Sequence, residues 1–147
     1  MKIKIITPKT SKEWKQYYNL RHEVMNKPSG YPKSSAYDEK DAKSIHVAAF
    51  YADKIVGVGR LHYDNDDFGT GYIRFMAVAF DNQSQGSGSK ILEEIEARAK
   101  KQGSKELRLK ARENAVGFYK KNGFKILDKC TEKFFKTPHW NMKKTIK

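Results

Sequence analysis

Ala77-Val78-Ala79-Phe80-Asp81-Asn82-Gln83-Ser84-Gln85-Gly86-Ser87-Gly88-Ser89-Lys90 joins an apolar stretch to an amphipathic one through a loop of glycine and serine. Residues 71–80 predict a buried strand, and residues 90–102 carry apolar side chains at helical spacing. Glycines allow close approach of the backbone to a ligand, and a helix N-terminus attracts anions. The stretch therefore predicts a site for a pyrophosphate, with a flexible connection as the simpler alternative.

Two familiar phosphate motifs do not fit this loop. A P-loop requires Gly-Lys followed by Ser or Thr, whereas Gly88 is followed by Ser89 and Lys90. A dinucleotide fingerprint requires a third glycine at the position of Ile91 and a parallel βαβ unit. Both motifs are excluded, so any phosphate site here has another architecture.

The rest of the chain predicts one mixed α/β (α+β) domain over residues 1–147. Thr10 or Ser11 is expected to cap the first helix, Gly103 to end the second, and Asn114 to cap a third that ends at Gly123. The predicted order is β-α-β-β-β-α-β-α-β-β, a mostly antiparallel sheet flanked by helices. The predicted strands are residues 2–7, 45–52, 55–63, 71–80, 106–110, 124–127 and 131–144, the helices residues 11–25, 90–102 and 115–122, and residues 27–44 form a long loop.

The charge is strongly positive. The 147 residues carry a formal net charge of +13, and 24 lysines outnumber 6 arginines. Arginine is the usual reader of base edges and the bidentate partner of phosphate, so this balance favours a solvated lysine surface. Nucleic acid is therefore not an expected partner, although a basic module that binds RNA or another polyanion remains an alternative.

The sequence also predicts several absences. A single cysteine, Cys130, excludes an internal disulfide, and four dispersed histidines do not form a zinc motif, so no metal is expected. The apolar run 45–52 is too short to cross a bilayer, and the alternating N-terminus does not resemble a secretion signal. We therefore expect a cytoplasmic protein that has no membrane contact.

Four segments together resemble the GNAT superfamily of N-acetyltransferases, in its small bacterial single-domain form. Gln83, Gly86 and Gly88 fit the pattern Gln/Arg-x-x-Gly-x-Gly/Ala, which is similar to that family's acyl-CoA pyrophosphate loop. Residues 73–78 resemble its fourth strand, and residues 114–124 its Asn-x-x-x-x-Phe-Tyr-x-x-x-Gly-Phe segment. Residues 137–144 are similar to the closing strand of a subgroup. The spacing and order of elements agree from about residue 3 to residue 144.

The resemblance implies that acetyl-CoA is the co-substrate. It also implies a V-shaped gap between the fourth and fifth strands, in which the pantetheine arm lies like an additional strand. Main-chain groups near Met76 and Val78 would hold this arm and stabilise an oxyanion. The coenzyme-binding residues implied in this way are Met76, Ala77, Val78, Gln83, Ser84, Gln85, Gly86, Ser87, Gly88, Ser89, Asn114, Phe118, Tyr119 and Lys121.

By the same resemblance, Tyr119 is the leading catalytic residue. Transfer from a thioester releases a thiolate, and a phenol near the sulfur can protonate it as a general acid. A buried aromatic packed beside Phe118 and Phe124 is the structural alternative for this residue.

The general base is less well defined by the sequence. Many family members carry a glutamate on the fourth strand, where this chain has Arg74, which cannot accept a proton. A water held by Glu23, His46 or His139 can replace it, and each of these residues also has a purely structural interpretation. Arg74 then either binds an acidic group of the substrate or faces solvent.

These observations favour an N-acetyltransferase that moves the acetyl group from acetyl-CoA directly to a primary amine in a ternary complex. The acceptor is a small molecule or a peptide, and a homodimer is compatible with the sequence. Tyr31 and Tyr37 of the long loop are expected to shape the acceptor side, where Asp38, Glu39 and Asp41 attract a cationic amine or keep the loop soluble. A protein of this fold that binds CoA without catalysis is the second alternative, since Arg74 replaces the usual acid.

Overall fold

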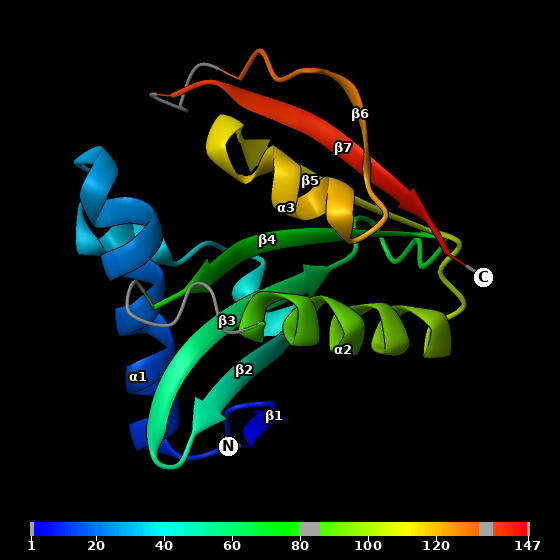
Figure 1. The fold of residues 1–147 in the computed structure, drawn as a ribbon. Coiled ribbons are helices and arrows are strands. Elements are labelled where there is room, and N and C mark those ends of the chain that lie inside the picture. The colour runs from blue at the N-terminus through cyan, green and yellow to red at the C-terminus, as the bar shows by residue number, and fades with distance from the viewer. Residues whose placement is uncertain (1, 80–85, 133–136, 147) are drawn as a thin grey trace.

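A computed structural model describes residues 2–79, 86–132 and 137–146 of the chain. Seven strands form one sheet in the spatial order β1-β2-β3-β4-β5-β7-β6 (Figure 1). All neighbouring strands are antiparallel except β4 and β5, which are parallel. The elements are β1 Ile3–Ile6, α1 Ser11–Arg21, β2 Ile45–Tyr51, β3 Lys54–His62, β4 Thr70–Val78, α2 Ser87–Lys101, β5 Glu106–Arg112, α3 Val116–Lys121, β6 Lys125–Lys129 and β7 His139–Thr145. The predicted fold class and element order are confirmed.

Helices cover both faces of the sheet. α1 packs Tyr17 and Leu20 on one face, against Ala48 and its neighbours. α2 packs Ile91 and Ile95 on the other face, where α3 covers β5 (Figure 1). Because β2 and β3 are covered on both sides, their residues are buried almost without interruption instead of in alternation, and these include the polar residues His46, Arg60 and His62.

Local signals fix most helix ends. Thr10 accepts a hydrogen bond from the Glu13 amide while the Glu13 carboxylate accepts one from the Thr10 amide, which completes a capping box. Gly103 and Gly123 follow the ends of α2 and α3 with φ of 88° and 95°. The prediction for Asn114 as a helix cap is wrong, because Asn114 lies within a 3₁₀ turn, Glu113–Ala115, and α3 begins after that turn with Ala115 at its N-cap.

The segment after α1 is more ordered than a loop. One π-helical turn, His22–Asn26, continues α1, and short 3₁₀ turns follow over Lys27–Ser29, Lys33–Ala36 and Asp41–Lys43. Side chains of this segment bond to buried arginines, as described below, and these contacts supply order that its sequence pattern does not show.

The two parallel strands pair over only part of their length. Their register runs from Thr70 opposite Glu106 to Ile73 opposite Leu109, and beyond this point the strands separate. In Figure 1, β4 and β5 lie close together at the right and diverge toward the left. The sheet therefore opens where the carboxyl ends of β4 and β5 approach the start of α2.

Two searches of the described ranges give negative results. Residues 2–79, 86–132 and 137–146 contain no helix long and apolar enough to cross a membrane. The same residues contain no cluster of three or more His, Cys, Asp or Glu side chains placed to hold a metal ion.

Candidate functional site

A cavity of about 310 Å³ occupies the opening between β4 and β5, and we call it the splay cavity. Its walls come from β4, β5, the start of α2, the turn before α3 and α3 itself. The lining residues are Val24, Met25, Met76, Ala77, Val78, Gly86, Gly88, Lys110, Ala111, Arg112, Asn114, Ala115, Phe118, Tyr119 and His139. The structure thus brings together eight residues that the sequence implicated: Met76, Ala77, Val78, Gly86, Gly88, Asn114, Phe118 and Tyr119, with His139 beside them.

β4 carries a bulge where it enters the splay cavity. Arg74 pairs with Arg60 and Ala77 with Val58, so Phe75 and Met76 both stand opposite the single residue Gly59. Phe75 has φ of 56°, a conformation that costs of order 1–3 kcal/mol in a residue with a side chain. The Ala79 amide donates to the Val56 carbonyl of β3. Because N–H directions alternate along a strand, the Met76 amide is directed away from β3, toward the opening.

The start of α2 forms one end of the splay cavity. α2 begins at Ser87, three residues earlier than predicted, after Gly86 adopts a left-handed φ of 80°. The first helical bond runs from Lys90 to the Gly86 carbonyl, so the preceding amides have no partner within the helix. A Cβ at Gly88 would lie 2.9 Å from Cζ of Phe118, which shows how closely α2 meets α3.

Ser87 supplies a second polar group at this helix start. Its Oγ is buried and has no hydrogen-bond partner among the residues that the structure describes, which is uncommon for a hydroxyl in a protein interior. The first-turn residue Ser89 is partly buried beside it. Gln83, Ser84 and Gln85, which were expected to complete the cradle, lie outside the described residues.

Tyr119 is fixed by aromatic contacts on two sides. Its ring meets Phe118 and Phe124 edge to face, with ring centroids 5.1 and 5.8 Å apart. Burial raises the pKa of the Tyr119 phenol, and the Arg112 charge only partly opposes this. The phenol therefore keeps its proton at neutral pH and can act as a donor toward the splay cavity. The structural role beside Phe118 and Phe124 and the role as a donor are compatible.

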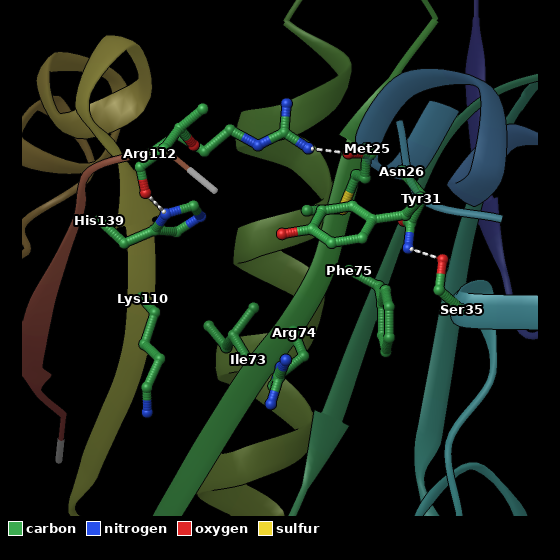
Figure 2. A pocket seen from close by; sticks show the side chains of 11 residues that line it. Met25, Asn26, Tyr31, Ser35, Ile73, Arg74, Phe75, Lys110, Arg112 and His139 are labelled. Carbon is green, nitrogen blue, oxygen red and sulfur yellow. Dashed lines mark hydrogen bonds between the residues drawn. The ribbon is translucent and has the colours of Figure 1, made fainter. Parts of the chain in front are cut away.

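A second cavity, of about 170 Å³, adjoins the splay cavity, and we call it the arginine cavity. Met25, Lys110, Arg112 and His139 line both. Figure 2 shows His139 and Lys110 on one side, Tyr31, Ser35 and Phe75 on the other, and Arg74 rising from β4 between them. The full lining is Met25, Asn26, Tyr31, Ser35, Ile73, Arg74, Phe75, Lys110, Arg112, Thr137 and His139.

His139 stands where the two cavities meet. Its Nδ1 lies 2.9 Å from the Thr137 carbonyl, which can only accept, so Nδ1 carries the proton and Nε2 the lone pair. Burial lowers the pKa of His139, with smaller contributions in the same direction from Arg112 and Arg74. The ring is therefore neutral at pH 7 and able to accept a proton.

The other two residues considered for the base lie elsewhere. His46 is buried against Trp14 and Tyr17, its Nδ1 is 2.8 Å from the Tyr17 hydroxyl, and its Nε2 is 2.8 Å from the Asp41 carbonyl. Glu23 is exposed on the turn after α1 and lines a separate groove with Lys54. The structure brings neither residue to Tyr119.

A buried pair of arginines lies beneath the Phe75 bulge, and the sequence did not indicate it. Arg21 and Arg60 are fully buried, and their guanidinium carbons lie 4.3 and 4.9 Å from the Phe75 ring centroid. Asp41 bonds to both arginines, at 3.2 and 2.8 Å, and Asp38 bonds to Arg60 at 2.6 Å. These two acids hold the segment after α1 to the sheet, so their carboxylates are already paired with cations.

Two further predicted residues occupy less central places. Lys121 is exposed in the last turn of α3 and does not line the splay cavity. Tyr37 is 48% exposed and packs against Tyr18, whereas Tyr31 lines the arginine cavity.

Comparison with known proteins places this geometry in context. Residues 13–146 match the family model described as an acetyltransferase (GNAT) domain. The uncharacterized N-acetyltransferase YjcF of Bacillus subtilis is 29% identical over 142 residues, which cover 97% of this chain and 99% of that protein.

Solved structures share the fold at lower identity. A putative N-acetyltransferase from Lactobacillus plantarum has a TM-score of 0.83 at 20% identity, over 99% of both chains. An aminoglycoside 6'-N-acetyltransferase complexed with coenzyme A has a TM-score of 0.79 at 18% identity, over 99% of this chain and 97% of that one. A GNAT family acetyltransferase from Elizabethkingia anophelis with acetyl-CoA bound has a TM-score of 0.72 at 22% identity, over 98% of both. With the family model matched along nearly the whole chain, the protein belongs to the GNAT family of acetyltransferases.

Proposed function

We propose that residues 1–147 form a single acyltransferase domain that transfers the acetyl group of acetyl-CoA directly to a primary amine in a ternary complex. The observation that carries the proposal is the end of β4–β5 pairing at Ile73 and Leu109, which opens a cavity between the Met76 backbone, the start of α2 and Tyr119. Members of the same fold have been solved with coenzyme A or acetyl-CoA.

The residues of the splay cavity suit the coenzyme chemically. The Met76 amide is available to an extended amide-bearing arm as if to a neighbouring strand. The amides at the start of α2 offer hydrogen-bond donors to a diphosphate, and the buried Ser87 Oγ beside them has no partner among the described residues. The bound coenzyme supplies the acetyl thioester, and the protein supplies orientation and proton transfer.

Tyr119 and His139 take the two proton-transfer roles in this proposal. The amine nitrogen forms a bond to the acetyl carbon, and the carbon–sulfur bond breaks. Tyr119 gives its phenolic proton to the departing thiolate, while Nε2 of His139 takes a proton from the amine, directly or through one water. The raised pKa of Tyr119 and the lowered pKa of His139 place each residue in the required protonation state at neutral pH.

Two measurements test this proposal. Calorimetry with acetyl-CoA should show one binding site, and thiol release should rise when an amine acceptor is added. A protein that binds acetyl-CoA but releases no thiol with any amine would be the catalytically silent alternative. A protein that binds RNA with a steep salt dependence and shows no heat with acetyl-CoA would be the basic binding module.

A further inference from the structure

Arginine pairing divides the six arginines of the chain into two groups. Arg21 and Arg60 contact Asp38 and Asp41, Arg98 contacts Glu94, and Arg108 contacts Glu106. Among the described residues, Arg74 and Arg112 are the two arginines without a carboxylate partner. Both line the arginine cavity, beside His139.

The two arginines of this second group are not equivalent. Arg112 donates through Nη2 to the Met25 carbonyl at 2.6 Å, which fixes its guanidinium in the wall shared with the splay cavity. Arg74 makes no hydrogen bond or ion pair with any residue that the structure describes, and its closest ring contact is Phe75, 5.7 Å from its guanidinium carbon. Its side chain is partly buried. Asp38 and Glu132 lie near enough to act on Arg74 electrostatically, but neither forms an ion pair with it, so this arginine has lost much of its hydration without gaining a direct carboxylate partner.

The acidic side chains near Arg74 are paired with other cations. Lys110 bonds to Glu132 at 2.9 Å, Lys40 bonds to Asp64 at 2.5 Å, and Asp38 is already held by Arg60. The cations next to Arg74 thus have their own acids, and the cavity retains the charge of Arg74 and Arg112. A polycationic amine is repelled by such a cavity, whereas an anionic group is attracted.

We propose that the amine acceptor carries a carboxylate, and that Arg74 binds this carboxylate while the amine points toward His139 and the splay cavity. The inference rests on the proposed acetyl transfer and narrows its substrate class. A guanidinium pairs with a carboxylate through two parallel N–H···O bonds, which fixes orientation as well as position. Figure 2 shows Arg74 and Phe75 as neighbours on β4, across the cavity from His139 and Lys110. The Phe75 ring is therefore available to an apolar part of such an acceptor.

The test compares amines that differ in the carboxylate alone. The full chain with acetyl-CoA is given L-phenylalanine or L-phenylalaninamide, glycine or glycinamide, and L-lysine or cadaverine, with thiol release as the readout. In at least one of these three pairs, we expect the carboxylated amine to have a kcat/KM about tenfold or more above that of the amine without the carboxylate. The amine without the carboxylate cannot form the charge-assisted bidentate pair with Arg74.

Variants of Arg74 test whether this residue causes the preference for a carboxylate. Arg74→Gln should lower kcat/KM for the carboxylated amine by about tenfold and leave that of the corresponding amide within about threefold, because only the carboxylated amine uses the guanidinium. Arg74→Lys should keep part of the preference for the carboxylated amine, because lysine keeps the positive charge but lacks the planar guanidinium donors that bind a carboxylate in a bidentate way. Arg98→Gln, a change of the same chemistry on α2 at a residue already paired with Glu94, should keep the whole preference.

Three results would overturn the inference: equal or better activity with the carboxylate-free partners, an equal loss for a carboxylated amine and its amide in Arg74→Gln, or no acetylation of any carboxylated amine. Calorimetry with acetyl-CoA on the same samples distinguishes failure of the carboxylate inference from failure of the proposed acetyl transfer. Normal acetyl-CoA binding without a carboxylate preference overturns this inference alone, and absence of binding overturns the proposed function as well.

Discussion

Ile73 of β4 and Leu109 of β5 are the last residues paired between the two parallel strands. Beyond them β4 bulges at Phe75, and the strands diverge around the splay cavity. An open sheet between parallel strands leaves main-chain groups without their usual ladder partners, and a ligand with amide groups can replace the missing strand. The predictions below follow from this opening and from the groups at its rim.

Tyr119→Phe removes the proposed acid and keeps the ring. We expect kcat to fall by about 10²-fold or more, because general acid catalysis contributes at least this much. The Kd for acetyl-CoA should change by less than about threefold, since the Phe118 and Phe124 contacts remain. Thiol-release assays measure kcat, and calorimetry measures the Kd for acetyl-CoA.

Tyr51→Phe is the matched control, because Tyr51 is 40% exposed on β2 and does not line either cavity. Unchanged turnover in Tyr119→Phe would remove Tyr119 from the acid role.

Ser87→Ala distinguishes a ligand-binding hydroxyl from a structural one. Because Ser87 Oγ is buried without a partner among the described residues, its removal should leave the free energy of unfolding unchanged or raise it slightly. Acetyl-CoA affinity should fall by about tenfold to a hundredfold, the amount of one hydrogen bond to a charged group. Urea unfolding and calorimetry check the two effects.

Ser104→Ala is the control for Ser87→Ala, because it removes a buried serine hydroxyl that has a hydrogen-bond partner. Ser104 is also buried, but its Oγ donates to the Phe68 carbonyl at 2.6 Å, and the change should cost about 1 to 3 kcal/mol of stability without altering acetyl-CoA affinity. Loss of stability in Ser87→Ala with unchanged affinity would assign Ser87 to the fold instead of the site.

His139→Gln tests the base through the pH profile of kcat. The base acts in its neutral form, and burial lowers the pKa of His139 below the ordinary 6.5. The wild-type rate should therefore persist below pH 6.5 and fall as the pH drops through that lowered pKa. In His139→Gln this acid limb should disappear and kcat should fall by about 10²-fold. An acid limb that persists unchanged in His139→Gln would mean that another group is the base.

Arg60→Met tests the buried arginine pair. The change leaves Asp38 and Asp41 with fewer cations, and breaking a buried ion pair from one side costs about 3 to 5 kcal/mol. Arg98→Met removes a half-exposed helical pair with Glu94 and a hydrogen bond to Thr7, and it should cost at most about 1.5 kcal/mol. Urea unfolding of both variants measures the contrast, and equal losses would contradict an anchoring role for Arg60.

Much of the fold can be predicted from the sequence because helix caps and helix-ending glycines depend only on neighbouring residues. The cap at Thr10 and the glycines that follow α2 and α3 act within one helical turn, and the structure confirms each of them. The capping prediction for Asn114 failed because a 3₁₀ turn and an α-helix have similar starting residues. Competition between them is decided by packing against β5, which a single stretch of sequence does not encode.

The candidate site follows from sequence only in part. Glycine spacing indicated the helix start near Gly86 and Gly88, because phosphate chemistry constrains the backbone there. The bulge at Phe75 has no comparable signal, since a phenylalanine with positive φ is held by tertiary contacts with Arg21 and Arg60. Burial of these arginines also runs against their usual exposure, so Asp38 and Asp41 could not be recognised as their partners.

A structure of the protein with acetyl-CoA would locate the coenzyme relative to the splay cavity. We expect a pantetheine arm within hydrogen-bond distance of the Met76 backbone, with the diphosphate at the amides of Ser87 and Gly88 and the sulfur beside the Tyr119 hydroxyl. A coenzyme bound outside the splay cavity, or bound there with its sulfur remote from Tyr119, would contradict this expectation.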